Sequence, residues 1–205
     1  MKTALEFIAV GKELSQPIDA NEETQQEIYA VGLLMQMAGE LALSAGRLLS
    51  GGEHYAGSAL VRQIVEIEYL TWTFKEGHRS ANKWLQSTHD ERMKLFSPRE
   101  LRKTSKGRFL SRDYQHHCEQ GGHPVPLGSF LLGAQSPGSA QMLLVDLIVH
   151  CWRTWDQVVQ WSTATPQAAA IVLAQGQQIS ARLNQWGKRD PMYALMVERY
   201  PEKKS

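Results

Sequence analysis

The sequence predicts an all-α protein, a helical bundle of four main helices with short helical inserts. Three observations predict this class. Apolar residues recur every three or four positions over long stretches, glycine and proline mark the breaks between them, and the alternation typical of strands is missing from the sequence. A chain of 205 residues can bury a core without a disulfide or a metal ion. We therefore expect one helical domain over residues 1–205.

The long helices are predicted from their start signals, their apolar periodicity and their breakers. Asn21 is a good N-cap for the first, and Ser50-Gly51-Gly52 ends it. The second is apolar on more than one side, which places it in the middle of the bundle. Pro166 opens the fourth at the first helical position. The four span residues 22–49, 53–75, 139–162 and 167–186, and a short last helix covers 192–199.

Shorter helices are predicted between the second and third long ones. Ser97 before Pro98, with Glu100 three positions after Ser97, is a strong start signal for one of them. Prolines and glycines over about 120–138 predict a loop that is long for a compact domain, and loops of that length tend to carry function. The short helices are expected at residues 80–86, 88–95, 98–103 and 108–119.

Charge and cysteine content narrow the function classes. The net charge of +1, from 22 basic and 21 acidic residues, excludes a globally basic protein that coats nucleic acid. Cys118 and Cys151 are too few for a secreted disulfide framework, so we expect free thiols and a cytoplasmic location. The N-terminus lacks a signal-peptide cleavage pattern, and the apolar segment 142–152 is too short for a membrane span. No membrane contact is predicted.

Residues 108–126 are the segment in which a reactive centre is most expected, because three of the seven histidines gather there with Cys118 and Arg112. A metal site is disfavoured, since a structural zinc ion needs four ligands and no cysteine pair completes the set. His150 and Cys151, inside an apolar helix, are expected in the core. We therefore predict no cofactor and no metal. The clustered histidines are His116, His117 and His123.

A basic segment leads into this cluster. Between residues 92 and 112 the chain carries eight lysines and arginines against Glu100 alone. A solvated charged surface is the ordinary interpretation, but a basic patch that runs into a histidine cluster also suits a phosphate-bearing ligand such as RNA. The candidate RNA-binding residues are Arg99, Arg102, Lys103, Lys106 and Arg108.

The second long helix holds charged residues among apolar neighbours. Arg62 and Glu66 are four residues apart, so they can pair on one face as a structural ion pair. Alternatively, Glu66 or Glu68 reaches the histidine cluster and orients an imidazole ring, as outer carboxylates do. The sequence leaves both interpretations open.

Arg112 and His117 are the candidate catalytic pair. An arginine can stabilise the charge that develops on a phosphorus centre while a neutral histidine moves a proton, and Asp113 would position the arginine. This Arg-x4-His spacing resembles the Arg-x4-6-His motif of the HEPN superfamily of helical-bundle proteins. The resemblance implies a metal-independent endoribonuclease of a toxin or phage-defence type. It also implies a homodimer and an antitoxin or regulatory partner.

A second resemblance covers about residues 55–160. The order of the helix with Arg62 and Glu66, the basic helices and Gly121-Gly122-His123-Pro124 resembles an uncharacterised bacterial group of HEPN-like proteins. It implies that His123 lies near the same site as Arg112. The competing hypothesis is a non-enzymatic helical interaction or regulatory protein. An enzyme would expose Arg112 and His117 in a cleft, whereas a scaffold would bury them in satisfied contacts.

Overall fold

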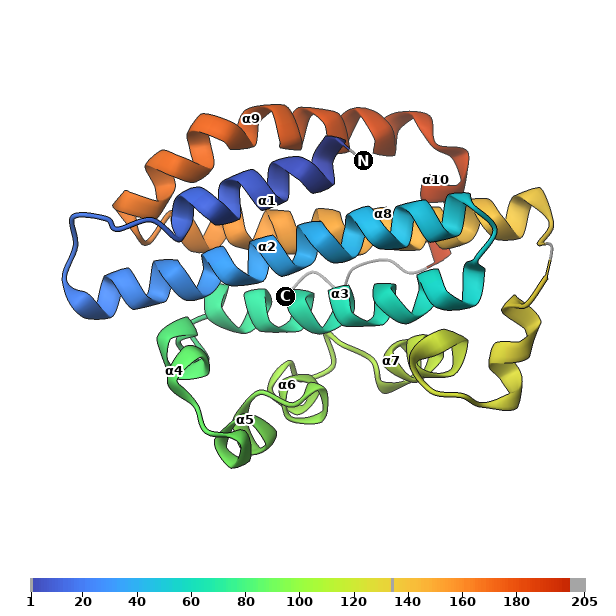
Figure 1. Ribbon diagram of the computed structural model, residues 1–205, viewed down its shortest axis with the longest axis horizontal. Coiled ribbons are helices and arrows are strands. Elements are labelled where there is room, and N and C mark those ends of the chain that lie inside the picture. The colour runs from blue at the N-terminus through green and yellow to red at the C-terminus, as the bar shows by residue number, and fades with distance from the viewer. Residues whose placement is uncertain (1, 134, 200–205) are drawn as a thin grey trace.

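The computed structural model confirms an all-helical protein (Figure 1). It describes residues 2–133 and 135–199, with side chains up to residue 195, and this part of the chain contains no strand. The helices are α1 (Lys2–Leu14), α2 (Glu22–Ser50), α3 (His54–Lys75), α4 (Ala81–Gln86), α5 (His89–Leu95), α6 (Pro98–Thr104), α7 (Ser111–His117), α8 (Pro137–Ser162), α9 (Pro166–Arg189) and α10 (Pro191–Arg199), with a π-helical turn η1 (Cys118–Gly122) and a 3-10 turn η2 (Pro126–Leu131).

The ends of the long helices follow the local signals in the sequence. The Asn21 side chain accepts a hydrogen bond from the Thr24 amide at 2.9 Å and caps α2. Gly52, with a φ of 88°, lets the chain turn into α3. Ser136 caps α8 just before Pro137. As a result, α2, α3, α8 and α9 begin and end within three residues of the predicted bounds.

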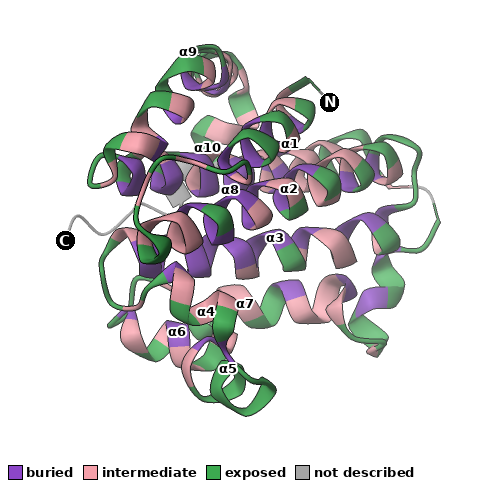
Figure 2. Cartoon of the chain, turned by 60° about the vertical axis from the view of Figure 1, so that its left-hand side comes forward, coloured by how far each residue is buried: buried purple, intermediate pink, exposed green. Residues whose placement is uncertain are grey.

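The long helix α3 is central. It packs against α2 and α8 on one side and against α6, α7 and η1 on the other, while α1 and α9 cover the far side of α2 and α8 (Figure 1). Of the remaining short helices, α4 packs on α2 and α5 on α6. Figure 2 shows that the buried residues line the faces that these helices turn toward one another. The Thr71 hydroxyl donates to Gln157 Oε1 at 2.6 Å and joins α3 to α8 inside the core.

Helix α1 is an addition to the predicted elements, and glycines explain how it packs. A Cβ atom on Gly39 would lie 2.7 Å from the Ala4 carbonyl oxygen, and one on Gly11 would lie 2.6 Å from the Gly32 carbonyl oxygen. The backbones of α1 and α2 therefore meet directly along a glycine seam formed by Gly11, Gly32 and Gly39. This contact is tertiary, so local start signals do not reveal it.

The loop predicted over 120–138 contains two short turns in the structure, η1 and η2. The helix predicted over 108–119 is shorter in the structure. Helix α7 covers Ser111–His117, and the chain then continues into the π-helical turn η1. A Cβ atom on Gly121 would lie 2.7 Å from the Ala59 amide nitrogen. The turn thus presses its backbone onto α3 and fixes the end of α7 against the core.

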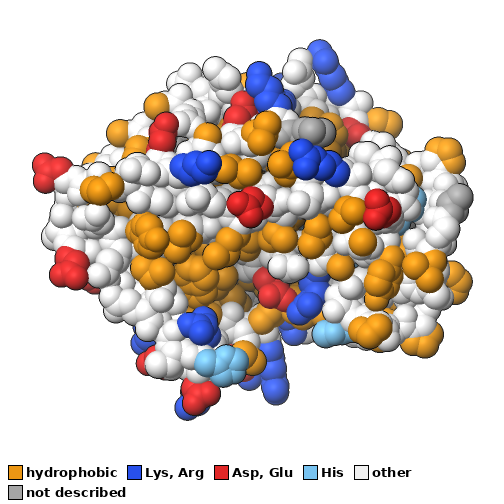
Figure 3. All heavy atoms as spheres, viewed as in Figure 1, with side chains coloured by type: hydrophobic (Ala, Val, Ile, Leu, Met, Phe, Trp, Pro, Cys, Tyr) orange, Lys and Arg blue, Asp and Glu red, His pale blue; other side chains and the backbone are white. Residues whose placement is uncertain are grey.

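An apolar groove lies on the outside of the fold. It has a volume of about 440 Å³ and lies between α2, α3 and α4, with Met37, Leu41, Leu60 and Trp84 among its lining residues. Figure 3 shows apolar side chains gathered over these helices. Apolar surfaces of this kind are common at protein contacts.

One described helix, α2, is long and apolar enough to cross a membrane by length and composition alone. Its most apolar window is 56% buried within the fold, as in the core helix of a globular domain. This burial favours a core role for α2.

Candidate functional site

The structure places Arg112 and His117 in different surroundings, although both lie on α7. The Arg112 side chain is 74% exposed and lies 3.5 Å from the Asp113 carboxylate, measured from Nε to Oδ1. The His117 side chain is only 8% exposed. The exposure of Arg112 is what an RNA-cleaving pair requires, whereas the burial of His117 is what a non-enzymatic scaffold protein would show.

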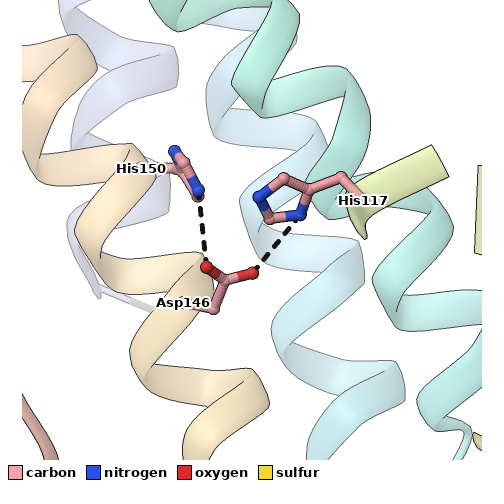
Figure 4. A group of neighbouring side chains, drawn as sticks. All are labelled: His117, Asp146 and His150. Carbon is pink, nitrogen blue, oxygen red and sulfur yellow. Dashed lines mark ion pairs between the residues drawn. The ribbon is translucent and has the colours of Figure 1, made fainter. Parts of the chain in front are cut away.

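His117 points from the end of α7 toward Asp146 and His150 on α8 (Figure 4). Its Nδ1 atom lies 3.5 Å from Asp146 Oδ2, and the Nε2 atom of His150 lies 3.4 Å from Asp146 Oδ1. The two imidazole rings cross edge to face with centroids 4.9 Å apart. Burial lowers the pKa of His117 to about 4, against the opposing effect of Asp146. We call His117, Asp146 and His150 the His–Asp–His cluster.

Glu68 of α3 contacts His150 at Nδ1, the ring nitrogen that does not face Asp146. Its Oε2 atom lies 2.5 Å from the His150 Nδ1 atom, and both side chains are buried. Burial disfavours charge on both groups, but their attraction outweighs it. The pKa of His150 rises to about 9 and that of Glu68 falls below its usual range. The two therefore form a buried ion pair.

Of the alternatives predicted for the acids of α3, the structure shows the ion pair. Glu66 makes the predicted pair with Arg62, with Oε1 2.8 Å from the Arg62 Nη2 atom, and it also accepts from the Tyr114 hydroxyl at 2.7 Å. Glu68 contacts the imidazole of His150, which lies outside the predicted cluster of His116, His117 and His123. Glu66 therefore belongs to an arginine site, described next.

The arginine site comprises Arg62, Glu66, Arg102 and Tyr114. The Tyr114 hydroxyl accepts from Arg62 Nη2 at 3.1 Å, and the Arg102 guanidinium lies 4.3 Å from the centroid of the Tyr114 ring. Burial and the Glu66 carboxylate raise the pKa of Tyr114 to about 12, so its hydroxyl stays protonated at neutral pH. Within the described residues, Nε and Nη1 of Arg102 and Nε of Arg62 are buried without an acceptor.

The remaining predicted site residues are peripheral. His116 is exposed, with its ring centroid 6.0 Å from that of His117. His123 is exposed beyond η1, and its carbonyl oxygen accepts from the Tyr55 hydroxyl at 3.3 Å. Lys103 pairs with Glu100 at 2.7 Å. The other basic residues predicted to bind RNA, apart from half-buried Arg102, are exposed: Arg99, Lys106 and Arg108.

The sequence predicts His150 in the core and does not single out Asp146 as a site residue. His150 is buried as predicted, but it also faces His117 and Asp146. A signal was present, because Asp146 and His150 are four residues apart in an apolar helix and therefore share a face. Two polar groups on the buried face of one helix indicate a polar partner across the core.

Comparison of the chain with protein-family models, with curated proteins and with solved structures found no match.

Proposed function

We propose that this protein is a HEPN-like helical bundle that binds a phosphate-bearing ligand of the RNA class on the face formed by α6 and α7. The four longest helices, α2, α3, α8 and α9, would be its main helices. The observation that carries the proposal is the Arg102 guanidinium, which stacks on Tyr114 while its Nε and Nη1 atoms are buried without an acceptor.

Charge at the arginine site favours an anion. The site holds two guanidinium groups and one carboxylate, and that carboxylate, Glu66, is already engaged by Arg62 and Tyr114. An unpaired buried donor costs about 1–3 kcal/mol, so a small shift that opens the Arg102 guanidinium to a ligand with several acceptor oxygens is favoured. A phosphate group has that chemistry, and the exposed Arg99, Lys106 and Arg108 extend the positive surface along the chain.

The first test measures binding of a fluorescent single-stranded RNA by anisotropy, in excess chelator, for wild type and for Arg102→Gln. We expect the variant to bind about tenfold more weakly, because one charge-assisted phosphate contact is lost. The slope of log affinity against log salt should become less negative by about 0.7. Arg47→Gln, which removes an exposed arginine from α2, is the matched control and should bind like wild type. Equal losses in both variants, or no RNA binding by wild type, would overturn the proposal.

Cleavage of RNA by Arg112 and His117 stays a separate prediction. If His117 acts as the base of a metal-independent ribonuclease, end-labelled RNA is cut by wild type in excess chelator and is left intact by His117→Ala. His116→Ala, which removes the exposed neighbouring imidazole, should cut like wild type. Cleavage that needs a metal ion, or that survives His117→Ala, would exclude this pair as the catalytic centre.

The predicted homodimer, the antitoxin or regulatory partner and the cytoplasmic location likewise stay proposals. The apolar groove beside Met37 and Trp84 is a surface on which a protein contact would bury apolar area. The alternative of a non-enzymatic interaction protein predicts that this groove is used and that RNA is not bound.

A further inference from the structure

The His–Asp–His cluster has a donor set that the RNA-binding proposal does not use. Two imidazoles and one carboxylate converge from α7 and α8, and their ligand atoms all lie within 4.8 Å of one another (Figure 4). Two histidines with a carboxylate are a common set of protein ligands for catalytic zinc and related divalent ions. The three side chains come from segments separated by the long loop, so their meeting is a property of the fold.

The distances in the cluster suit a shared cation better than direct hydrogen bonds. Nitrogen–oxygen hydrogen bonds measure about 2.7–3.2 Å. The two contacts of Asp146 are longer, 3.5 Å to His117 and 3.4 Å to His150. Ligand atoms placed about 2.0–2.2 Å from a tetrahedral ion lie about 3.3–3.6 Å apart, which is the length of each of these two contacts. The carboxylate thus has one oxygen directed at each imidazole, and the ligand atoms, one per residue and all within 4.8 Å of one another, would draw closer together around a bound ion.

Glu68 supplies the outer contact that metal-bound histidines usually make. A carboxylate that accepts the Nδ1 proton of a histidine fixes the tautomer and turns the Nε2 lone pair toward the ion. Here Glu68 lies 2.5 Å from His150 Nδ1, and His150 Nε2 faces Asp146. With Nδ1 committed to Glu68, a metal ion that displaces the Nε2 proton of the imidazolium finds two ligand atoms, His150 Nε2 and Asp146 Oδ1, facing each other.

We propose that His117, Asp146 and His150 bind one divalent transition metal ion of the zinc class, with Glu68 as the group that positions His150. Three protein ligands leave a fourth tetrahedral position for water or for a ligand, as in catalytic rather than structural zinc sites. Asp146 keeps 23% of its side-chain surface exposed, whereas the His117 side chain is 8% exposed, so access is from the Asp146 side. This proposal is independent of RNA binding by the arginine site, but a metal-bound His117 cannot also be the base of the metal-independent cleavage reaction.

The test titrates chelator-treated, desalted full-length protein with Co²⁺ and follows visible absorption, then repeats the titration with Zn²⁺ by calorimetry. We expect one equivalent of metal per chain and the intense spectrum of four-coordinate Co²⁺. Asp146→Asn, which preserves shape, should weaken binding at least a hundredfold. The matched control is His116→Gln, which removes an exposed imidazole next to His117 and should bind like wild type.

Several outcomes would overturn the proposal: no stoichiometric metal in wild type, an octahedral Co²⁺ spectrum, or binding lost in His116→Gln but kept in Asp146→Asn. The wild-type spectrum decides the geometry even if Asp146→Asn proves unstable, and circular dichroism of each variant reports its folding. The RNA-binding experiment is run in chelator and this one without RNA, so failure of one proposal leaves the other to be judged on its own data.

Discussion

Replacing Glu68 by alanine is expected to lower the free energy of unfolding by about 3–5 kcal/mol in metal-free buffer. Glu68 is 2% exposed and is the close partner of His150 Nδ1. Removing one member of a buried pair leaves the other without a partner in a medium of low dielectric constant, and truncation adds a cavity. Urea unfolding in chelator, followed by circular dichroism at 222 nm as the standard helix signal, measures the loss.

The substituted side chain decides how the Glu68 result is interpreted. Glu68→Gln keeps an acceptor oxygen near His150, so it should lose less stability than alanine does. Glu40→Ala removes an exposed acid from α2 and should change stability by less than about 0.5 kcal/mol. An alanine variant at position 68 as stable as wild type would show that the buried ion pair contributes nothing to the fold.

Replacing Trp155 by alanine should cost a similar amount, about 3–5 kcal/mol, by a different mechanism. Trp155 is 1% exposed, stacks on Phe7 of α1 with ring centroids 5.8 Å apart, and donates from its indole nitrogen to Ser180 of α9 at 2.9 Å. A Cβ atom on Gly176 would lie 2.7 Å from its ring. The indole therefore fills the space between α1, α8 and α9, and alanine leaves a cavity where three helices meet.

Urea unfolding followed by circular dichroism measures the Trp155 effect as well. Leu173→Ala, at a side chain that is 60% exposed on α9, is the control and should lie within about 0.5 kcal/mol of wild type. Trp155→Phe retains most of the ring volume and loses the hydrogen bond, so its free energy of unfolding should lie between that of Trp155→Ala and that of wild type. An unfolding midpoint for Trp155→Ala equal to that of wild type would contradict the packing described for α1, α8 and α9.

The long helices could be predicted from sequence because their signals are local. Asn21 caps α2 and Pro166 opens α9, and apolar periodicity fills the interval between such marks. Helix α1 was not predicted because it lacks comparable capping and proline signals and is held in place by residues far away in the sequence. Its docking depends on the close approach of Gly11 and Gly39 to the partner helix, which no rule of local periodicity contains.

The contacts in the candidate sites also differ in whether the local sequence predicts them. The pairing of Arg62 with Glu66 follows from their spacing on one helix and could be predicted. The meeting of His117 with Asp146 could not, because it depends on how η1 presses onto α3 and how α8 is rotated after an irregular loop. Rotation about a helix axis changes which residues face the core without changing the sequence pattern much, so long-range polar contacts need the tertiary structure.

The contacts between α1 and α9 have a consequence for biosynthesis. Arg182 of α9 donates to Glu6 and to Thr3 of α1, joining residues 176 or more positions apart. Because a ribosome adds roughly 5–20 residues per second, α1 waits roughly ten to thirty seconds for that partner to be made. During this interval the nascent chain can close the α1–α2 hairpin through its glycine seam, but Phe7 lacks its Trp155 neighbour for most of it. Until α8 and α9 are made, the face of α1 that carries Phe7 therefore lacks its tertiary partners in the nascent chain.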